Sequence, residues 1–282
     1  MGIEQWFLRL VLGAGIGFCI GLTGIGGGVL VLPALTVVLG LPSSIAVGTA
    51  SLYAFLTKCY ATFEHFRLKT IDIRTSLFLL LGAVPGNVVT AWVINRAVKH
   101  MGAEGESMAR FQQGLKMFIA FVVLFSAIVL IVDLVLKGHR AGSGTGNSVG
   151  ARLNSRPTLK WTIAVITGTV IGSLIGATSV GGGVLMIPAL IILFGLPSSR
   201  TVGTSIFVAV ILTFMTSIVY GASGQMDWNT ALLMALGSLA GVPLGSKLCA
   251  RLPERGLRGL VIAVVFVSAI LMFVRRSVTG GH

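Results

Sequence analysis

The sequence is poor in charged residues. Asp, Glu, Lys and Arg make up 10% of its 282 residues, whereas an ordinary soluble domain carries about 25%. Hydrophobic residue types make up 55%, and the mean hydropathy is +0.96. Such a chain cannot cover its surface with polar groups, which excludes a soluble enzyme, a secreted disulfide scaffold and a disordered protein. What remains is an α-helical membrane protein, in which each span takes about 20 residues.

Residues that carry catalysis or bind metals are also scarce. Cys19, Cys59 and Cys249 lie in or at the end of apolar segments without metal or disulfide spacing, so we interpret them as packing residues. The four histidines lie in loops or tails, and no Asp or Glu lies in the middle of a predicted span. Walker-type and HExxH motifs are absent. The sequence therefore predicts no enzyme, no metal, no cofactor and no carboxylate proton relay.

The few charges are mostly positive, with 21 Lys and Arg against 8 Asp and Glu. In a soluble protein this balance suggests nucleic-acid binding. In a membrane protein, positive charge gathers in the cytoplasmic loops. We therefore expect the lipid bilayer, and no nucleic acid, as the partner of these charges.

Ten apolar segments fall into two groups of five. The first group lies at about 6–23, 26–40, 44–64, 74–95 and 111–136, and the second at 160–178, 181–195, 200–221, 228–250 and 257–274. The stretch between them is rich in Gly and Ser, which is typical of a flexible linker. We therefore predict a first transmembrane repeat at 1–136, a linker at 137–159 and a second transmembrane repeat at 160–282.

The two groups are copies of one another. Residues 21–52 align without a gap with residues 176–207, a shift of 155 positions, and 18 of these 32 positions are identical. Chance predicts roughly three identities in so glycine-rich a composition. The sequence therefore contains an internal duplication.

The distribution of positive charge favours an inverted arrangement of the copies. The loop after the third segment contains Arg67, Lys69 and Arg74, whereas its counterpart at 222–230 contains no Lys or Arg. Equivalent loops are therefore expected on opposite sides of the membrane. The predicted fold class is an all-α polytopic membrane protein with two inverted repeats of about five segments, a cytoplasmic linker and both termini outside.

Each copy contains a short segment interrupted by glycine and proline. The first consists of Thr23, Gly26, Gly27, Gly28 and Pro33, and the second of Thr178, Gly181, Gly182, Gly183 and Pro188. Three consecutive glycines break a helix, and bare backbone at membrane depth is tolerated only where it is buried or lines a cavity. Paired broken segments in inverted halves are typical of a transporter's substrate site near the midplane. We therefore predict an anion site where these two short or re-entrant helices meet.

A tandem GxxxG pattern precedes each triplet. It consists of Gly13, Gly17 and Gly21 in the first copy and of Gly168, Gly172 and Gly176 in the second. This spacing is typical of close helix contacts in membranes. We interpret these six glycines as packing residues, which could serve a homodimer as well as the fold.

Polar side chains in the third segment of each copy are further candidates. Pro-Ser-Ser, at 42–44 and 197–199, is interpreted as a turn and helix N-cap. The hydroxyls one turn further on could bind an oxyanion or could equally bond back to the helix backbone; they belong to Thr49, Ser51, Thr204 and Ser205. Lys58 is the ionisable residue that lies well inside a predicted span, where it could contact the substrate or extend to the membrane interface.

Four repeated features carry a resemblance to a known family: the glycine triplet, the proline after it, the Gly-Leu-Pro turn and the Val-Gly-Thr that follows. With these features in both copies, the sequence resembles the sulfite exporter TauE/SafE family of secondary transporters. The likeness extends from Trp6 to about Arg276 and includes both copies of the motif. It implies a carrier of small sulfur-containing anions, such as sulfite, sulfoacetate or related organosulfonates, in the inner membrane of a bacterium or archaeon. It also assigns the Thr, Gly and Pro positions of the two triplet segments to the substrate site. Gly24 of the first copy corresponds to Ser179 of the second, so the pocket need not be symmetric.

The predicted function is therefore export of such an anion by alternating access. Two alternatives remain: an anion channel, and a membrane sulfur-relay protein that uses its cysteines. A carrier saturates and exchanges its substrate whereas a channel conducts, and a relay protein would lose activity when its cysteines are replaced.

Overall fold

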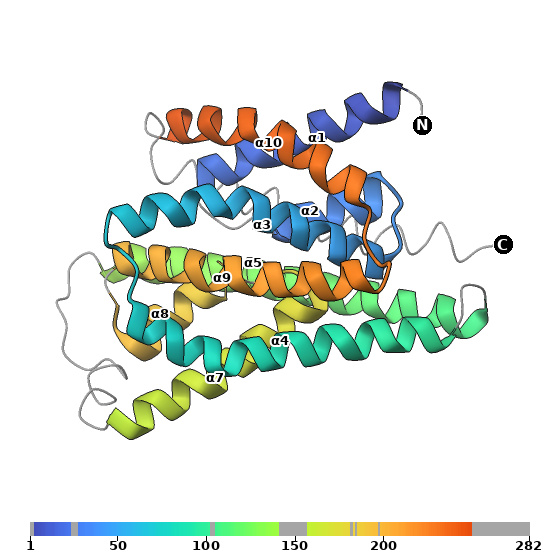
Figure 1. The fold of residues 1–282 in the computed structure, drawn as a ribbon. Helices are drawn as coiled ribbons and strands as arrows, with labels where there is room; N and C mark the ends of the chain where they lie inside the picture. Colours follow the sequence, from blue (N-terminus) through green and yellow to red (C-terminus); the bar gives the residue numbers. More distant parts are fainter. Residues whose placement is uncertain are drawn as a thin grey trace.

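The structure is a computed structural model, and it describes residues 3–23, 28–101, 105–140, 157–180, 183, 185–196 and 198–249. Within these ranges every regular element is a helix, and α3, α4, α5 and α9 lie roughly along one axis, with α7 inclined to it (Figure 1). The helices are α1 (Ile3–Thr23), α2 (Gly28–Pro33), η1 (Ala34–Val38), α3 (Ser43–Arg67), α4 (Ile73–Met101), α5 (Glu106–Arg140), α7 (Pro157–Thr178), α8 (Met186–Phe194), α9 (Ser198–Ala222) and α10 (Trp228–Cys249).

The all-α membrane fold predicted from the composition is confirmed. Four of the described helices are long and apolar enough to cross a bilayer, namely Ile73–Met101, Thr158–Thr178, Arg200–Ala222 and Trp228–Gly245. The helices follow the predicted apolar segments to within a few residues, except that α4 and α5 are longer. Helical structure also covers 137–140 and 157–159, which the prediction assigned to the linker, and the predicted segment at 257–274 lies outside the described residues.

The tightest packing joins helices from different copies. Helix α1 packs along α10, and α7 packs along α4. A Cβ atom at Gly13 would collide with the Met234 carbonyl of α10, and one at Gly168 would collide with the Leu79 carbonyl of α4. These two contacts are equivalent under the shift of 155 residues. Each copy therefore packs its first helix against a long helix of the other copy. In both pairs, α1 with α10 and α7 with α4, the two backbones are in direct contact.

Glycines on both sides of each pair allow this approach. On α4, Gly82 and Gly86 lie against Val165 and Thr169 of α7. On α10, Gly237 and Gly241 lie against Leu10 and Ala14 of α1 in the same way. The packing interpretation is thus confirmed for five of the six predicted glycines, namely Gly13, Gly17, Gly168, Gly172 and Gly176. The contacts of Gly21 lie outside what the structure describes.

Equivalent helices run in opposite directions. In Figure 1, α1 runs from right to left and α7 from left to right, and the same reversal relates α3 to α9 and α4 to α10. The packing of α1 along α10 recurs as the packing of α7 along α4 when the copies are exchanged, and these helices run opposite to their equivalents in the other copy. This is the geometry that inverted repeats require.

The starts of α4 and α7 carry an aromatic and cationic cluster. Trp161, at the start of α7, stacks on Phe78 of α4 with ring centroids 4.1 Å apart. The Arg74 guanidinium and the Lys160 ammonium lie 5.0 and 5.3 Å from the Trp161 ring. Tryptophan and basic side chains collect at the membrane–water interface. This cluster therefore has the composition of a membrane–water interface.

Candidate functional site

The first broken segment leads from α1 into a short irregular helix. Helix α1 ends at Thr23, Gly28 begins α2, and Pro33 is buried at the end of α2. The turns after Pro33 widen into the π-helix η1, a form common at functional sites. The proline nitrogen cannot donate a helical hydrogen bond, which favours this local change. Gly26, Gly27 and the Thr23 side chain lie outside the described residues.

The second broken segment begins with a left-handed residue. Helix α7 ends at the buried Thr178, and Ser179 then has a φ of 53°. Gly183 lies in a turn before α8, which contains Pro188. Gly181, Gly182 and the Pro188 side chain lie outside the described residues. A left-handed conformation ends a helix and is disfavoured for a residue with a Cβ.

Hydrogen bonds from both backbone and side-chain groups stabilise the end of α7. The Ser179 amide donates to the Ile175 carbonyl at 2.7 Å, and the Tyr220 hydroxyl of α9 donates to the Gly176 carbonyl at 3.1 Å. The Thr178 hydroxyl accepts a bond of 3.2 Å from the Val180 amide. The break is therefore a built feature of the fold, since groups that a continuing helix would pair find other partners.

The two breaks contribute to one hydrophobic cluster. Val31 and Leu32 of α2 belong to the same buried cluster as Val180, which lies between Ser179 and the second triplet. Tyr53 of α3 and Tyr220 of α9 belong to it as well. Side chains beside the two triplets, 155 residues apart in the sequence, thus share one core.

A polar network lies on one side of the second break. The Asn87 amide of α4 donates to the Gly172 carbonyl of α7 at 3.3 Å and to the Thr216 hydroxyl of α9 at 2.9 Å. All three residues are in membrane-spanning helices, and Asn87 and Thr216 are completely buried. Their equivalents in the other copy are Val242 and Ala61, so this network exists on one side only.

The threonines of the two Val-Gly-Thr motifs bind loops of the opposite copy. The Thr49 hydroxyl accepts a bond of 3.0 Å from the Asp227 amide, and the Thr204 hydroxyl accepts one of 3.0 Å from the Asp72 amide. Each aspartate caps the first turn of α10 or α4 through its own carboxylate. The two threonines therefore fix the starts of α10 and α4, the helices that pack closely against α1 and α7.

The neighbouring serine hydroxyls bond within their own helices. Ser51 donates to the Val47 carbonyl and Ser205 to the Val202 carbonyl, both at 2.8 Å. Lys58 lies in the second half of α3 and is partly exposed. In the described part of the chain, the Ser51 and Ser205 hydroxyls therefore bond back to their own helices and to neither triplet segment.

The serines of the first Pro-Ser-Ser element begin a helix and also form hydrogen bonds to distant segments. Helix α3 starts at Ser43, as the turn predicts. The Ser43 hydroxyl, however, donates to the Gln112 carbonyl of α5 at 3.2 Å, and the Ser44 hydroxyl donates to the Gln225 side chain at 2.7 Å. These serines thus connect three distant segments. The side chains of Ser198 and Ser199 lie outside what the structure describes.

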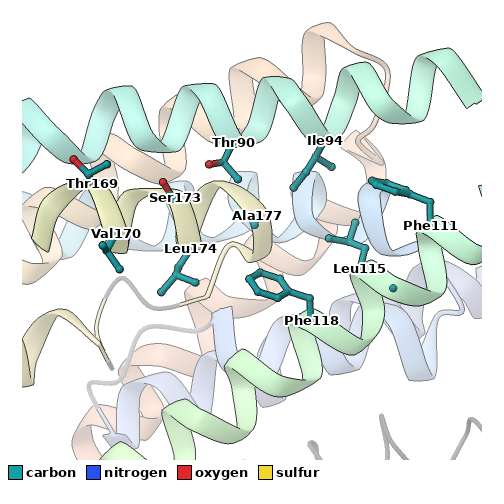
Figure 2. A pocket seen from close by; sticks show the side chains of 11 residues that line it. Thr90, Ile94, Phe111, Leu115, Phe118, Thr169, Val170, Ser173, Leu174 and Ala177 are labelled. Atoms are coloured by element: carbon teal, nitrogen blue, oxygen red, sulfur yellow. The ribbon is translucent and has the colours of Figure 1, made fainter. Parts of the chain in front are cut away.

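A pocket of about 660 Å³ lies between α4, α5 and α7 (Figure 2). Its walls are mainly aliphatic and aromatic, and its polar groups are the hydroxyls of Thr90, Thr169 and Ser173. Ala177, at the end of α7, forms one boundary. An anion would lose its hydration there without a cationic group among the lining residues, so this pocket does not suit an anionic substrate.

Comparison with known proteins decides the family. The family model described as sulfite exporter TauE/SafE matches residues 9–272. The chain belongs to this family. It is a multi-pass membrane transporter, in agreement with the resemblance seen in the motifs.

Relatives in the TauE/SafE family are similar over nearly their whole length. A probable membrane transporter protein of Bacillus subtilis, YjnA, is 30% identical and is aligned over 93% of this chain and 97% of its own. A probable membrane transporter protein of Xylella fastidiosa is 26% identical, with 98% of both chains covered. The archaeal MJ0441 of Methanocaldococcus jannaschii, of the same description, is 24% identical over 94% of each chain. No solved structure matches this chain significantly.

Sequence reasoning missed the asymmetric polar residues beside the second break. Asn87, Thr216 and Tyr220 lie in strongly apolar segments, and none belongs to a repeated motif. The signal available was the comparison of the copies, because their equivalents are Val242, Ala61 and His65. Polar residues inside spans that one copy lacks are candidates for a function that the duplication alone does not explain.

Proposed function

We propose that this protein is a secondary transporter that exports small sulfur-containing anions, such as sulfite or an organosulfonate like sulfoacetate, across the cytoplasmic membrane. The observation that carries the proposal is the shared cluster formed by Val31 and Leu32, which follow the first triplet, and Val180, which precedes the second. Membership of the TauE/SafE family supports the substrate class.

The proposed substrate site lies between the two triplet segments. It comprises Thr23, Gly26, Gly27, Gly28 and Pro33 from the first copy and Thr178, Gly181, Gly182, Gly183 and Pro188 from the second. Consecutive glycines leave backbone N–H groups accessible, and such groups bind anions without a buried formal charge. A bare backbone also permits the close approach that a compact oxyanion requires.

Other side chains act around this site. Thr49 and Thr204 support it by fixing the loops before α10 and α4. Ser51 and Ser205 lie next to these threonines in α3 and α9. Lys58 adds long-range attraction for the anion from the second half of α3.

The helix packing suggests which parts move. Because α1 is locked to α10 and α4 to α7 through their backbones, these pairs cannot separate during transport. We therefore assign the moving units to α1 with α10 and to α4 with α7, which rock against one another along the contact between α3 and α9. Phe55 of α3 and Phe214 of α9 lie at this contact, with ring centroids 4.9 Å apart.

Export of an anion needs no coupling ion. A membrane potential that is negative inside contributes about 2.3 kcal/mol per charge per 100 mV toward expulsion of an anion. The sequence places no carboxylate in the middle of a predicted span, which agrees with a carrier driven by the potential alone.

Reconstituted protein tests this proposal. Proteoliposomes are loaded with sulfite, sulfoacetate, sulfate or chloride, and uptake of radiolabelled sulfite is measured. We expect saturable uptake that is accelerated by internal sulfite or sulfoacetate, because a carrier exchanges substrate across the membrane. Folded protein that transports none of the sulfur anions would refute the proposal. Flux that neither saturates nor shows exchange would instead identify an anion channel.

A further inference from the structure

Ser179 carries a hydroxyl that the fold buries and does not use. Its side chain is 3% exposed, and no group that the structure describes lies within hydrogen-bonding distance of its Oγ. The neighbouring polar groups are satisfied: the Ser179 amide, the Val180 amide and the Thr178 hydroxyl all have partners. Buried hydroxyls without a partner are rare in native proteins because they lose their hydrogen bonds to water.

Backbone geometry would favour glycine at this position. Ser179 has a φ of 53°, and its equivalent in the first copy is Gly24. Lys69 is a second residue with a side chain and a φ of 53°, and its equivalent is Gly224, which has a φ of 69°. Lys69 is exposed, so its side chain is solvated, whereas that of Ser179 is buried and unpaired. Neither the backbone nor the packing therefore explains why serine stands at position 179.

We propose that the Ser179 hydroxyl binds the transported anion as a hydrogen-bond donor. The inference rests on the proposed function, and it adds a residue to the site between the two triplets. Ser179 lies directly before Val180, whose side chain shares a cluster with Val31 and Leu32 beside the first triplet. An anionic oxygen is the acceptor that a buried hydroxyl favours most, since a charged acceptor strengthens the bond.

This donor makes the site asymmetric and narrows the class of substrate. Gly24 supplies no side chain at the equivalent position, so the donor acts from the second copy alone. The Tyr220 hydroxyl and the Asn87 network hold the adjacent turns of α7, and the equivalent positions of the other copy are His65 and Val242. The preferred ligand is an anion that presents oxygen acceptors on one face, as sulfite and the sulfonate head group of an organosulfonate do.

Two substitutions separate the hydroxyl from the backbone. Ser179→Gly removes the hydroxyl and also relieves the strain of the left-handed backbone. Ser179→Ala removes the hydroxyl but leaves a side chain on the left-handed backbone. Binding of radiolabelled sulfite to purified protein in detergent is measured for both variants. We expect both to raise the Kd by about tenfold to a hundredfold, the loss typical of a hydrogen bond to a charged group.

Thermal unfolding without ligand supplies the matched control. Ser179→Gly and Lys69→Gly relieve the same backbone conformation, so both are expected to unfold at a higher temperature than the wild type. Lys69→Gly should retain the sulfite affinity of the wild type. A variant that is more stable and yet binds sulfite more weakly cannot owe its loss to misfolding.

The outcomes distinguish this inference from the proposed function. If the wild type binds and exchanges sulfite while both Ser179 variants keep its affinity, Ser179 is a structural residue and the inference is overturned. Loss of affinity in Ser179→Gly with normal affinity in Ser179→Ala would assign the effect to the backbone and also overturn it. A wild type that binds no sulfur anion would overturn the proposed function itself.

Discussion

Close packing between α1 and α10 predicts a sharp difference between two glycines of the same helix. A Cβ added at Gly17 would lie 2.7 Å from the Ser238 Cα and 2.8 Å from the Ser238 Cβ. Non-bonded carbon atoms prefer about 3.5–4.0 Å, so the substitution Gly17→Ala must move the two helices apart by roughly 1 Å. At Gly15, two positions away, an added Cβ meets nothing within 4 Å.

The expected cost follows from this geometry. Overpacking of a close contact costs about 1–3 kcal/mol. Alanine also favours the helix over glycine by about 1 kcal/mol, but this gain is common to Gly17→Ala and Gly15→Ala. The difference in unfolding free energy between the two variants therefore isolates the contact, and we expect Gly17→Ala to be less stable by about 1–3 kcal/mol.

The assay is loss of helical circular dichroism of purified protein in detergent, titrated with denaturing detergent. The same measurement on Gly172→Ala tests the equivalent pair, because a Cβ there collides with the Ala83 backbone of α4. Equal stability of Gly17→Ala and Gly15→Ala would refute the contact between α1 and α10, and with it the packing of each first helix against the other copy.

Three further predictions concern function and topology. Replacement of all three cysteines by serine should leave sulfite exchange in proteoliposomes largely intact, because we assign them no chemical role; lost exchange in folded protein would favour a sulfur relay. On that background, single cysteines at Lys69 and Gly224 should react with an impermeant thiol reagent from opposite sides of the membrane; labelling from one side would contradict inverted repeats. Cross-linking of Phe55→Cys with Phe214→Cys should block exchange, reversibly on reduction, because it fixes the contact along which the units rock; full exchange in cross-linked protein would rule out that motion.

Much of the fold could be predicted from the sequence because membrane helices are marked by length and composition. Each predicted apolar segment inside the described residues corresponds to a helix. The glycine pattern also predicted close packing, since Gly13 and Gly168 lack the side chain that would hold two backbones apart. The sequence could not indicate which helices these glycines would meet, because GxxxG spacing specifies a close partner without naming it.

The site was harder to predict than the fold. The repeated triplets mark where a helix breaks, but the π-helix after Pro33 depends on how that segment packs in three dimensions. Thr49 illustrates the same difficulty: its hydroxyl could have met the anion or its own helix, and the structure gives it the Asp227 amide instead. A long-range partner of this kind is set by tertiary contacts, which single-helix patterns do not encode.

Single residues that break the symmetry of the copies carried information that motif searches overlook. Asn87 and Tyr220 have apolar or unrelated equivalents, and both donate to carbonyls near the end of α7. Ser179 differs from Gly24 at the break itself. In a duplicated protein, the differences between the copies thus indicate where one half has acquired a role of its own.

Binding of the anion between the two glycine triplets is tested most directly by substitution of the middle glycine in each triplet. Binding of radiolabelled sulfite is compared among the wild type, Gly27→Leu, Gly182→Leu and the control Gly15→Leu, whose position has open space. We expect both triplet variants to reach the membrane at normal levels and to bind no measurable sulfite, while Gly15→Leu binds it like the wild type. Wild-type affinity in Gly27→Leu and Gly182→Leu would contradict binding between the triplets.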